Sequence, residues 1–205
     1  MVKGLFKLAV FALAVLLVFS VATTLKDGST LEDSLIRFHV KANSDSEADQ
    51  SLKMQVKDAV VEKLSAALEN VVDVKQAENW LRENLDTIKG WAKSALERLG
   101  SDQKVSVSLE EEAFPTRKYD TFSLPAGIYQ ALRITLGEGE GQNWWCVVFP
   151  SLCQSATTAD LQEAAQAAGF SERVTDTVTE NGTVYEVRFW LLDFFGKIKN
   201  ALHES

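Results

Sequence analysis

Apolar and polar residues form several distinct patterns along this chain, and the first is an apolar run near the N-terminus. Residues 8–19 are all apolar and follow two basic residues, Lys3 and Lys7. Residues 20–22 (Ser-Val-Ala) then match the small-x-small pattern of a cleavage site. The run is short for a membrane span, which needs ~20 apolar residues. We therefore expect residues 1–22 to be a secretory signal peptide, or an N-terminal anchor where cleavage fails, and the remainder to act outside the cytoplasm.

Two later stretches carry apolar residues at the three- and four-residue spacing of amphipathic helices. They run from 52 to 71 and from 77 to 99. Ser46 and Asp73 precede them with the spacing of N-caps, whose side chains accept from free backbone N–H groups. Gly100 stands where a left-handed C-cap is favoured. Because the joint between the two helices is short, the pattern predicts a helical hairpin that packs on another apolar surface.

The second half of the chain changes to the period-two alternation of strands. The expected strands, with a first one before the helices, are 35–40, 105–109, 128–136, 144–149, 174–179 and 183–190. The continuous apolar run 144–149 predicts a strand in the centre of the sheet, and residues 114–125 read as a loop. Asn181-Gly182 tolerates positive φ twice and predicts a hairpin between the last two strands. Short helices are expected at 157–168 and 191–202.

These elements predict one α+β domain over residues 33–205. An early helical hairpin packs on a mostly antiparallel sheet, and a short C-terminal helix closes the chain. The polar residues 23–32 read as a linker between this domain and the N-terminal run. Apolar residues make up 46% of the chain, enough for a substantial core. The net charge of −8 disfavours binding to nucleic acid and broad adhesion to anionic lipid.

Two cysteines, Cys146 and Cys153, are separated by six residues that include Pro150. In an oxidising compartment this pair favours one disulfide, with the proline in the turn between its ends. Two buried thiols are the structural alternative, because Cys146 lies in an apolar run. A thiol nucleophile at Cys146 with His39 as its base is the catalytic alternative. Burial in an apolar run raises a thiol pKa, which disfavours that chemistry.

Other catalytic and metal-binding signals are weak. The two histidines, His39 and His203, lie far apart, and no His-Glu-x-x-His or Gly-x-Ser-x-Gly motif occurs. The glycine-rich residues 137–141 hold two glutamates, which would repel phosphate, so they read as a flexible connection between strands. We expect no catalytic residues, no metal and no cofactor.

Aromatic residues suggest recognition at two places. Trp144 and Trp145 are adjacent, so a strand puts them on opposite faces and the core needs at most one of them. The other is then free for an interface, where tryptophan is enriched. Residues 189–195 are apolar enough to dock on a partner or to make a peripheral membrane contact. Such an amphipathic segment more commonly packs its apolar side on the sheet.

Two stretches resemble one family. Residues 35–46 (LIRFHVKANSDS), with Asp49-Gln50 after them, are similar to the N-terminal signature of the stage II sporulation protein R family. A second signature is matched by residues 124–133 (LPAGIYQALR) and by 137–150 (GEGEGQNWWCVVFP) through Cys153. The resemblance spans about residues 33–155, with local departures at Ser151 and Gln154. Beyond it the chain agrees with the family only in general character.

This resemblance implies a function that composition does not indicate. Family members are made in the forespore and exported into the space between forespore and mother cell. There they activate a membrane-bound sporulation aspartic protease, which cleaves an inactive sigma-factor precursor. The chain would thus be a signal, with the protease as receptor and an unknown oligomeric state. We expect the receptor-binding candidates at the surface to be Arg37, His39, Asn43, Asp45, Trp144 and Trp145. The alternative function is an exported cell-wall hydrolase or a thiol-dependent enzyme that uses Cys146.

Overall fold

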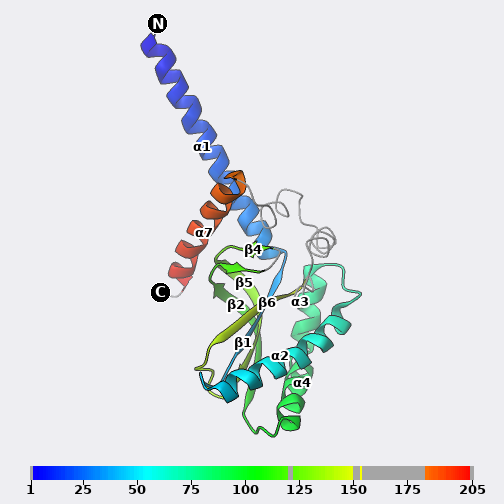
Figure 1. The fold of residues 1–205 in the computed structure, drawn as a ribbon. Helices are drawn as coiled ribbons and strands as arrows, with labels where there is room; N and C mark the ends of the chain where they lie inside the picture. The colour runs from blue at the N-terminus through cyan, green and yellow to red at the C-terminus, as the bar shows by residue number, and fades with distance from the viewer. Residues whose placement is uncertain (1, 120–121, 150–152, 154–182, 204–205) are drawn as a thin grey trace.

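The N-terminal apolar run is the start of a long helix that projects from the domain (Figure 1). The computed structural model describes residues 2–119, 122–149, 153 and 183–203. Helix α1 spans Val2–Asp33, and its window Phe6–Thr23 has a mean hydropathy of 2.3, with none of it buried against the protein. It is long and apolar enough to cross a membrane, a test that a signal sequence near the N-terminus also passes.

Residues 23–32, expected as a linker, are helical, because α1 continues through them to Asp33. Gly28 weakens the helix most in this segment, at a cost of ~1 kcal/mol relative to alanine. Near the end of the helix, Leu31 is only 1% exposed and packs with Leu35 in an apolar cluster. Tertiary packing therefore extends the helix into residues whose composition is that of a linker.

Four strands form the central sheet in the order β2-β5-β1-β6. Their bounds are β1 Ile36–Lys41, β2 Val105–Phe114, β5 Gly127–Leu136 and β6 Asn143–Phe149. The β1–β5 pair is parallel and the other two pairs are antiparallel, so the predicted mostly antiparallel sheet is confirmed. The central position predicted for 144–149 is wrong, because β6 lies outside β1 in this order. Its continuous apolar run has another cause: Val148 packs in a cluster on one face and Val147 in a cluster on the other.

Three helices cover one face of the sheet, as the predicted helical hairpin requires (Figure 1). They are α2 Glu47–Leu68, α3 Val74–Glu83 and α4 Leu85–Arg98. Ser46 and Asp73 cap α2 and α3 by accepting from backbone N–H groups at 3.1 and 2.8 Å, and Gly100 has φ of 74°. The second predicted helix is divided at Asn84, whose side chain donates to the Trp80 carbonyl at 2.8 Å.

Beside α1, a small two-stranded sheet covers part of the other face. It consists of β3 Arg117–Lys118 and β4 Ser123–Leu124. The prediction of a loop over residues 114–125 therefore missed short strands. They are held together by stacked rings, since Tyr119 and Phe122 have centroids 4.5 Å apart. The cluster beneath them contains Leu31, Leu35, Phe114, Phe122, Leu124, Tyr129, Ala131 and Val147.

The last element is helix α7, Thr183–His203. The strand predicted over 183–190 is wrong, because these residues begin this helix and extend the short one expected at 191–202. The hairpin turn 181–182, the strand 174–179 and the helix 157–168 lie outside the described residues. One side of α7 packs on the domain, where Leu192 is buried and Asp193 accepts from the Ala126 N–H at 3.1 Å.

Candidate functional site

At the end of the sheet remote from α1, two loops bind each other (Figure 1). We call residues 43–50 and 137–142 the loop clasp. The Asn43 side-chain oxygen accepts from the Glu138 N–H at 3.0 Å, and Asp45 accepts from the Gln142 N–H at 2.7 Å. These loops belong to the two segments that resemble the family. Their unusual sequences therefore have a structural explanation as the two halves of one contact.

Asp49 is the central acceptor of the loop clasp. Its carboxylate accepts from the side chains of Ser44 at 2.5 Å, Asn43 at 2.9 Å and Gln103 at 2.6 Å. These hydrogen bonds, with that from Ser44 the largest cause, lower the pKa of Asp49 to about 2. The carboxylate is therefore ionised at neutral pH, and it holds the side chains of Asn43 and Ser44 in the loop between β1 and α2.

Glycine and lysine complete the loop clasp. Gly137 has φ of 58°, and a Cβ on Gly141 would lie 2.2 Å from the Ser44 carbonyl oxygen, so both positions require glycine. Lys53 is 4% exposed and donates to the Gln142 carbonyl at 2.9 Å. Burial lowers the pKa of Lys53, and the charge of Asp45 opposes that shift. The glycine-rich segment is thus a connection between strands, as predicted, but one fixed by specific contacts.

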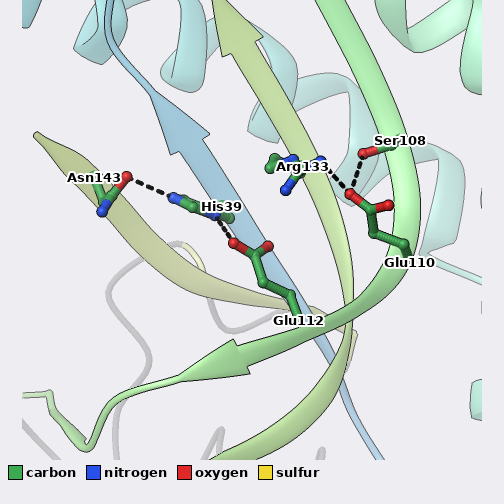
Figure 2. Close-up of polar contacts among 6 residues, drawn as sticks. All are labelled: His39, Ser108, Glu110, Glu112, Arg133 and Asn143. Carbon is green, nitrogen blue, oxygen red and sulfur yellow. Dashed lines mark hydrogen bonds and ion pairs between the residues drawn. The ribbon is translucent and has the colours of Figure 1, made fainter. Parts of the chain in front are cut away.

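The sheet face opposite the helices carries polar side chains, which we call the polar face (Figure 2). Its centre is His39, 3% exposed, whose Nδ1 lies 2.7 Å from Glu112 Oε1 and whose Nε2 lies 2.9 Å from Asn143 Oδ1. Beside it, Arg133 forms an ion pair with Glu110. The face therefore joins β1, β2, β5 and β6 through side-chain contacts across the strands.

Arg37, one row from His39 on the same strand, is completely buried. Its Nε donates to the Cys146 carbonyl at 3.3 Å and its Nη2 to the Tyr119 hydroxyl at 3.1 Å. The guanidinium carbon lies 4.3 Å from the centroid of the Phe114 ring. A delocalised cation is weakly hydrated and stacks on aromatic rings, which is why an arginine is tolerated here.

The expectation that Arg37 and His39 lie at the surface is therefore wrong. Both point to the face that β3, β4 and the end of α1 partly cover, and sequence spacing does not show this cover. Asp45 is exposed, as expected for a surface candidate, and Asn43 is half-buried within the loop clasp. Their role in binding a receptor stays a prediction.

The two tryptophans lie on opposite faces of β6, as predicted. Trp144 meets Phe38 edge-on at 6.1 Å on the helix-covered face. Trp145 stacks on His39 at 5.5 Å, and the Arg117 guanidinium carbon lies 3.7 Å from its ring centroid. Both are half-buried, so each contributes packing as well as a partly accessible edge.

Cys146 and Cys153 form a disulfide, with their Cα atoms 5.4 Å apart. Cys146 is 4% exposed. A nucleophile at this position needs a free thiolate. The bonded form offers none. The His39 ring lies on the sheet face opposite Cys146 and already has partners on both ring nitrogens.

No cluster of three or more His, Cys, Asp or Glu side chains suited to a metal occurs within the described part of the chain. A groove of about 690 Å³ lies where the start of α3 meets β2 and β5, next to the end of α1. Its lining mixes charges, with Lys75 and Arg82 near Glu78, Glu110 and Glu111. None of the six candidate residues lines it.

Sequence reasoning missed Glu112, Arg117 and Tyr119 on the polar face. A signal was present, because continuing the alternation of Ser106 and Ser108 places Glu110 and Glu112 on the same face. Arg117 and Tyr119 follow β2 within a segment interpreted as a loop. In a loop, no alternation of apolar and polar residues shows which face of the sheet a side chain approaches.

These features define an α+β domain that follows an apolar N-terminal helix, contains a disulfide and has a polar sheet face. Both the helix and the disulfide indicate an exported protein. The model of the family described as "Stage II sporulation protein R (spore_II_R)" matches residues 32–159. Stage II sporulation protein R of Bacillus subtilis (strain 168) is 35% identical over 187 residues, which cover 82% of this chain and 83% of that protein.

The chain belongs to the stage II sporulation protein R family. This membership assigns it a role in sporulation, and the family description names no enzymatic activity. No solved structure matches the chain.

Proposed function

We propose that this chain is the exported signal by which the forespore activates a membrane-embedded aspartic protease of the mother cell. The protease then cleaves an inactive sigma-factor precursor. The observation that carries the proposal is family membership over residues 32–159, together with 35% identity to a stage II sporulation protein R over most of both chains. The chain acts in the space between the two cells and serves as a ligand for the protease.

Export supports this proposal. The apolar window Phe6–Thr23 directs the chain to a membrane, and the Cys146–Cys153 disulfide suits an oxidising compartment. Cleavage after the window releases the domain, and retention keeps it at the membrane surface through α1. In either case the receptor meets the domain from outside the cytoplasm.

Activation by contact requires a difference in binding between two receptor states. A ligand shifts a two-state equilibrium only by its differential affinity, and a shift from 1:99 to 99:1 takes about 10⁴-fold tighter binding to the active state. One route is that the domain brings two receptor chains together, so that each supplies a catalytic aspartate.

The surface that we assign to the receptor is the polar face with the adjoining loop clasp. Asp45 and Asn143 are exposed there, and Arg133 and Trp145 are partly exposed. The opposite sheet face is covered by α2, α3 and α4, which leaves it unavailable. Directed polar groups around an aromatic residue are typical of interfaces that discriminate between partners.

Reconstitution tests the proposal. Membranes that hold the protease and its sigma precursor are mixed with the purified fragment 23–205, which retains the buried Leu31 and Leu35. We expect precursor cleavage that rises with fragment concentration and saturates. Membranes whose protease lacks a catalytic aspartate are the control and stay inactive. Absence of stimulation by a folded fragment at any concentration contradicts direct activation.

A further inference from the structure

Three hydrogen-bond donors on the polar face have no acceptor among the residues that the structure describes. Arg37 Nη1 and Arg117 Nε are buried and have no hydrogen-bond partner within the described residues. The Tyr119 hydroxyl accepts from Arg37 Nη2 at 3.1 Å, and no described residue accepts its own proton. A buried donor without an acceptor costs free energy, and a buried guanidinium without a counter-ion costs more.

These donors are close neighbours. Arg117 lies over the Trp145 ring at 3.7 Å, and Trp145 packs with the cluster that contains Phe114 and Tyr129. Arg37 lies 4.3 Å from the centroid of Phe114 in the same cluster. Burial lowers the pKa of Arg117, the charge of Arg37 lowers it further, and Tyr119 opposes the shift. The two cations therefore share one environment beside one hydroxyl group.

The charges around the donors select the ligand. Neither guanidinium group has an ion-pair partner among the described residues. The Glu112 carboxylate on the same sheet face is engaged by His39 through Oε1, and its Oε2 is unpaired. Two further carboxylates whose charges act on Tyr129, those of Glu32 and Asp193, are paired with Lys199 and Lys197. The excess is one positive charge, so the site accommodates a single negative charge. A dianion such as phosphate would bring a second negative charge that the site does not balance.

We propose that Arg117 and Tyr119, with the charge of the buried Arg37 beside them, bind one carboxylate group from an acidic segment of a protein partner. The carboxylate accepts from Arg117 and the Tyr119 hydroxyl, which belong to half-buried residues. Arg37 is completely buried and donates to the Tyr119 hydroxyl, so it contributes its positive charge. A planar carboxylate matches the fork of a guanidinium that is already held on an indole ring.

This inference deepens the proposed function, because it gives the chemistry of the group that the partner presents. It rests on the proposed function only where it identifies that partner as the receptor. The test uses no protease, so the two can fail separately. The full-length chain, labelled with ¹⁵N and held in a nanodisc, is titrated with acetyl-Gly-Gly-Glu-Gly-Gly-amide. The signal is the Trp145 indole N–H resonance, assigned among five tryptophans with Trp145→Phe.

We expect a saturable shift with the glutamate peptide and none with its glutamine analogue. Arg117→Gln weakens binding about tenfold or more, because it removes a charge-assisted hydrogen bond. Arg133→Gln is the matched control: it removes a cation from the same face that is already paired with Glu110, and it changes binding less than about twofold. Arg37→Lys keeps the positive charge but loses the planar guanidinium with its paired N–H donors, and we expect it to weaken binding as well.

Three results would overturn the proposal. The first is a wild-type chain that shows no saturable shift with the glutamate peptide. The second is a folded Arg117→Gln variant that titrates like wild type, which would make the interaction adventitious. The third is inorganic phosphate that binds as tightly as the peptide, which would contradict a site for one negative charge.

Discussion

The two faces of the central sheet differ in how they are stabilised. On one face, Phe38 and Val40 pack with side chains of α2, α3 and α4 in a continuous apolar cluster. On the other face, their neighbours Arg37 and His39 are just as buried but hold polar partners from segments far away in the sequence. Consecutive residues of β1 thus serve two purposes. We expect the apolar face to supply most of the stability, because it buries the larger apolar cluster, while the polar face holds buried polar and charged groups whose desolvation costs free energy.

Removal of an apolar side chain from the helix-covered face gives the largest expected effect. Phe38→Ala deletes a fully buried ring that also meets Trp144 edge-on at 6.1 Å. We expect the free energy of unfolding to fall by about 3–5 kcal/mol, because the cavity adds to the lost transfer free energy. Urea unfolding of the full-length chain and the variant measures this, and a loss below about 1 kcal/mol would show that the face repacks.

Loss of the disulfide comes next. Cys153→Ser leaves Cys146 buried and opens the short loop between them. The entropy of the unfolded chain then rises, and we expect a loss of about 2–3 kcal/mol. The matched control is wild type under reducing conditions, which should unfold at the same urea concentration as the variant. Retention of receptor activation by the folded variant distinguishes a structural bridge from an essential thiol.

Replacement of His39 by an apolar ring of similar size tests the polar face itself. His39→Phe preserves the stacking on Trp145 but leaves Glu112 Oε1 and the Asn143 side chain without this partner. We expect a loss of about 1–3 kcal/mol from the unsatisfied groups. A variant that is as stable as wild type would mean that the His39 hydrogen bonds contribute nothing net.

The loop clasp predicts a pH dependence. The pKa of Asp49 is about 2 in the folded chain, below its ordinary value of 3.8, so the unfolded state binds the proton more readily. The stabilisation is present above pH 3.8 and is lost as pH falls from there toward 2. Asp49→Asn should reduce the change in the urea midpoint between pH 5 and pH 3, and an unchanged difference would contradict the assignment to Asp49.

An exposed ion pair on the polar face gives the smallest effect. Arg133→Gln breaks the pair with Glu110, in which both side chains are about one-third to one-half exposed. Such pairs contribute little, and we expect the free energy of unfolding to change by less than about 1 kcal/mol. A larger loss of free energy of unfolding, measured by thermal unfolding, would show that this pair contributes substantially to the stability of the polar face.

The same comparison explains how far the sequence predicts the structure. Ser46, Asp73 and Gly100 could be assigned because a cap depends on residues within one turn, and the helix-covered face followed from apolar spacing. Arg37 and His39 could not be placed, because their burial depends on Tyr119 and Glu112, 82 and 73 residues away. A polar residue in an apolar strand has no local signal that separates a surface from a buried network.

The edge position of β6 and the helical residues 183–190 were missed for a similar reason. A continuous apolar strand is expected wherever both faces are covered, and at β6 this occurs outside the central pair, with Val147 and Val148 on opposite sides. Thr183 to Trp190 is rich in residues that favour strands, but it continues into the helix that packs Leu192 on the domain.

The central claim is that the polar face carries the partner contact and the helix-covered face carries the fold. Receptor-dependent cleavage of the sigma precursor, measured with equally stable Arg117→Gln and Lys89→Gln variants, tests it most directly, because Lys89 is an exposed cation on α4. The account predicts that Arg117→Gln weakens activation about tenfold while Lys89→Gln behaves like wild type. Full activation by Arg117→Gln, or an equal loss in both variants, would contradict it.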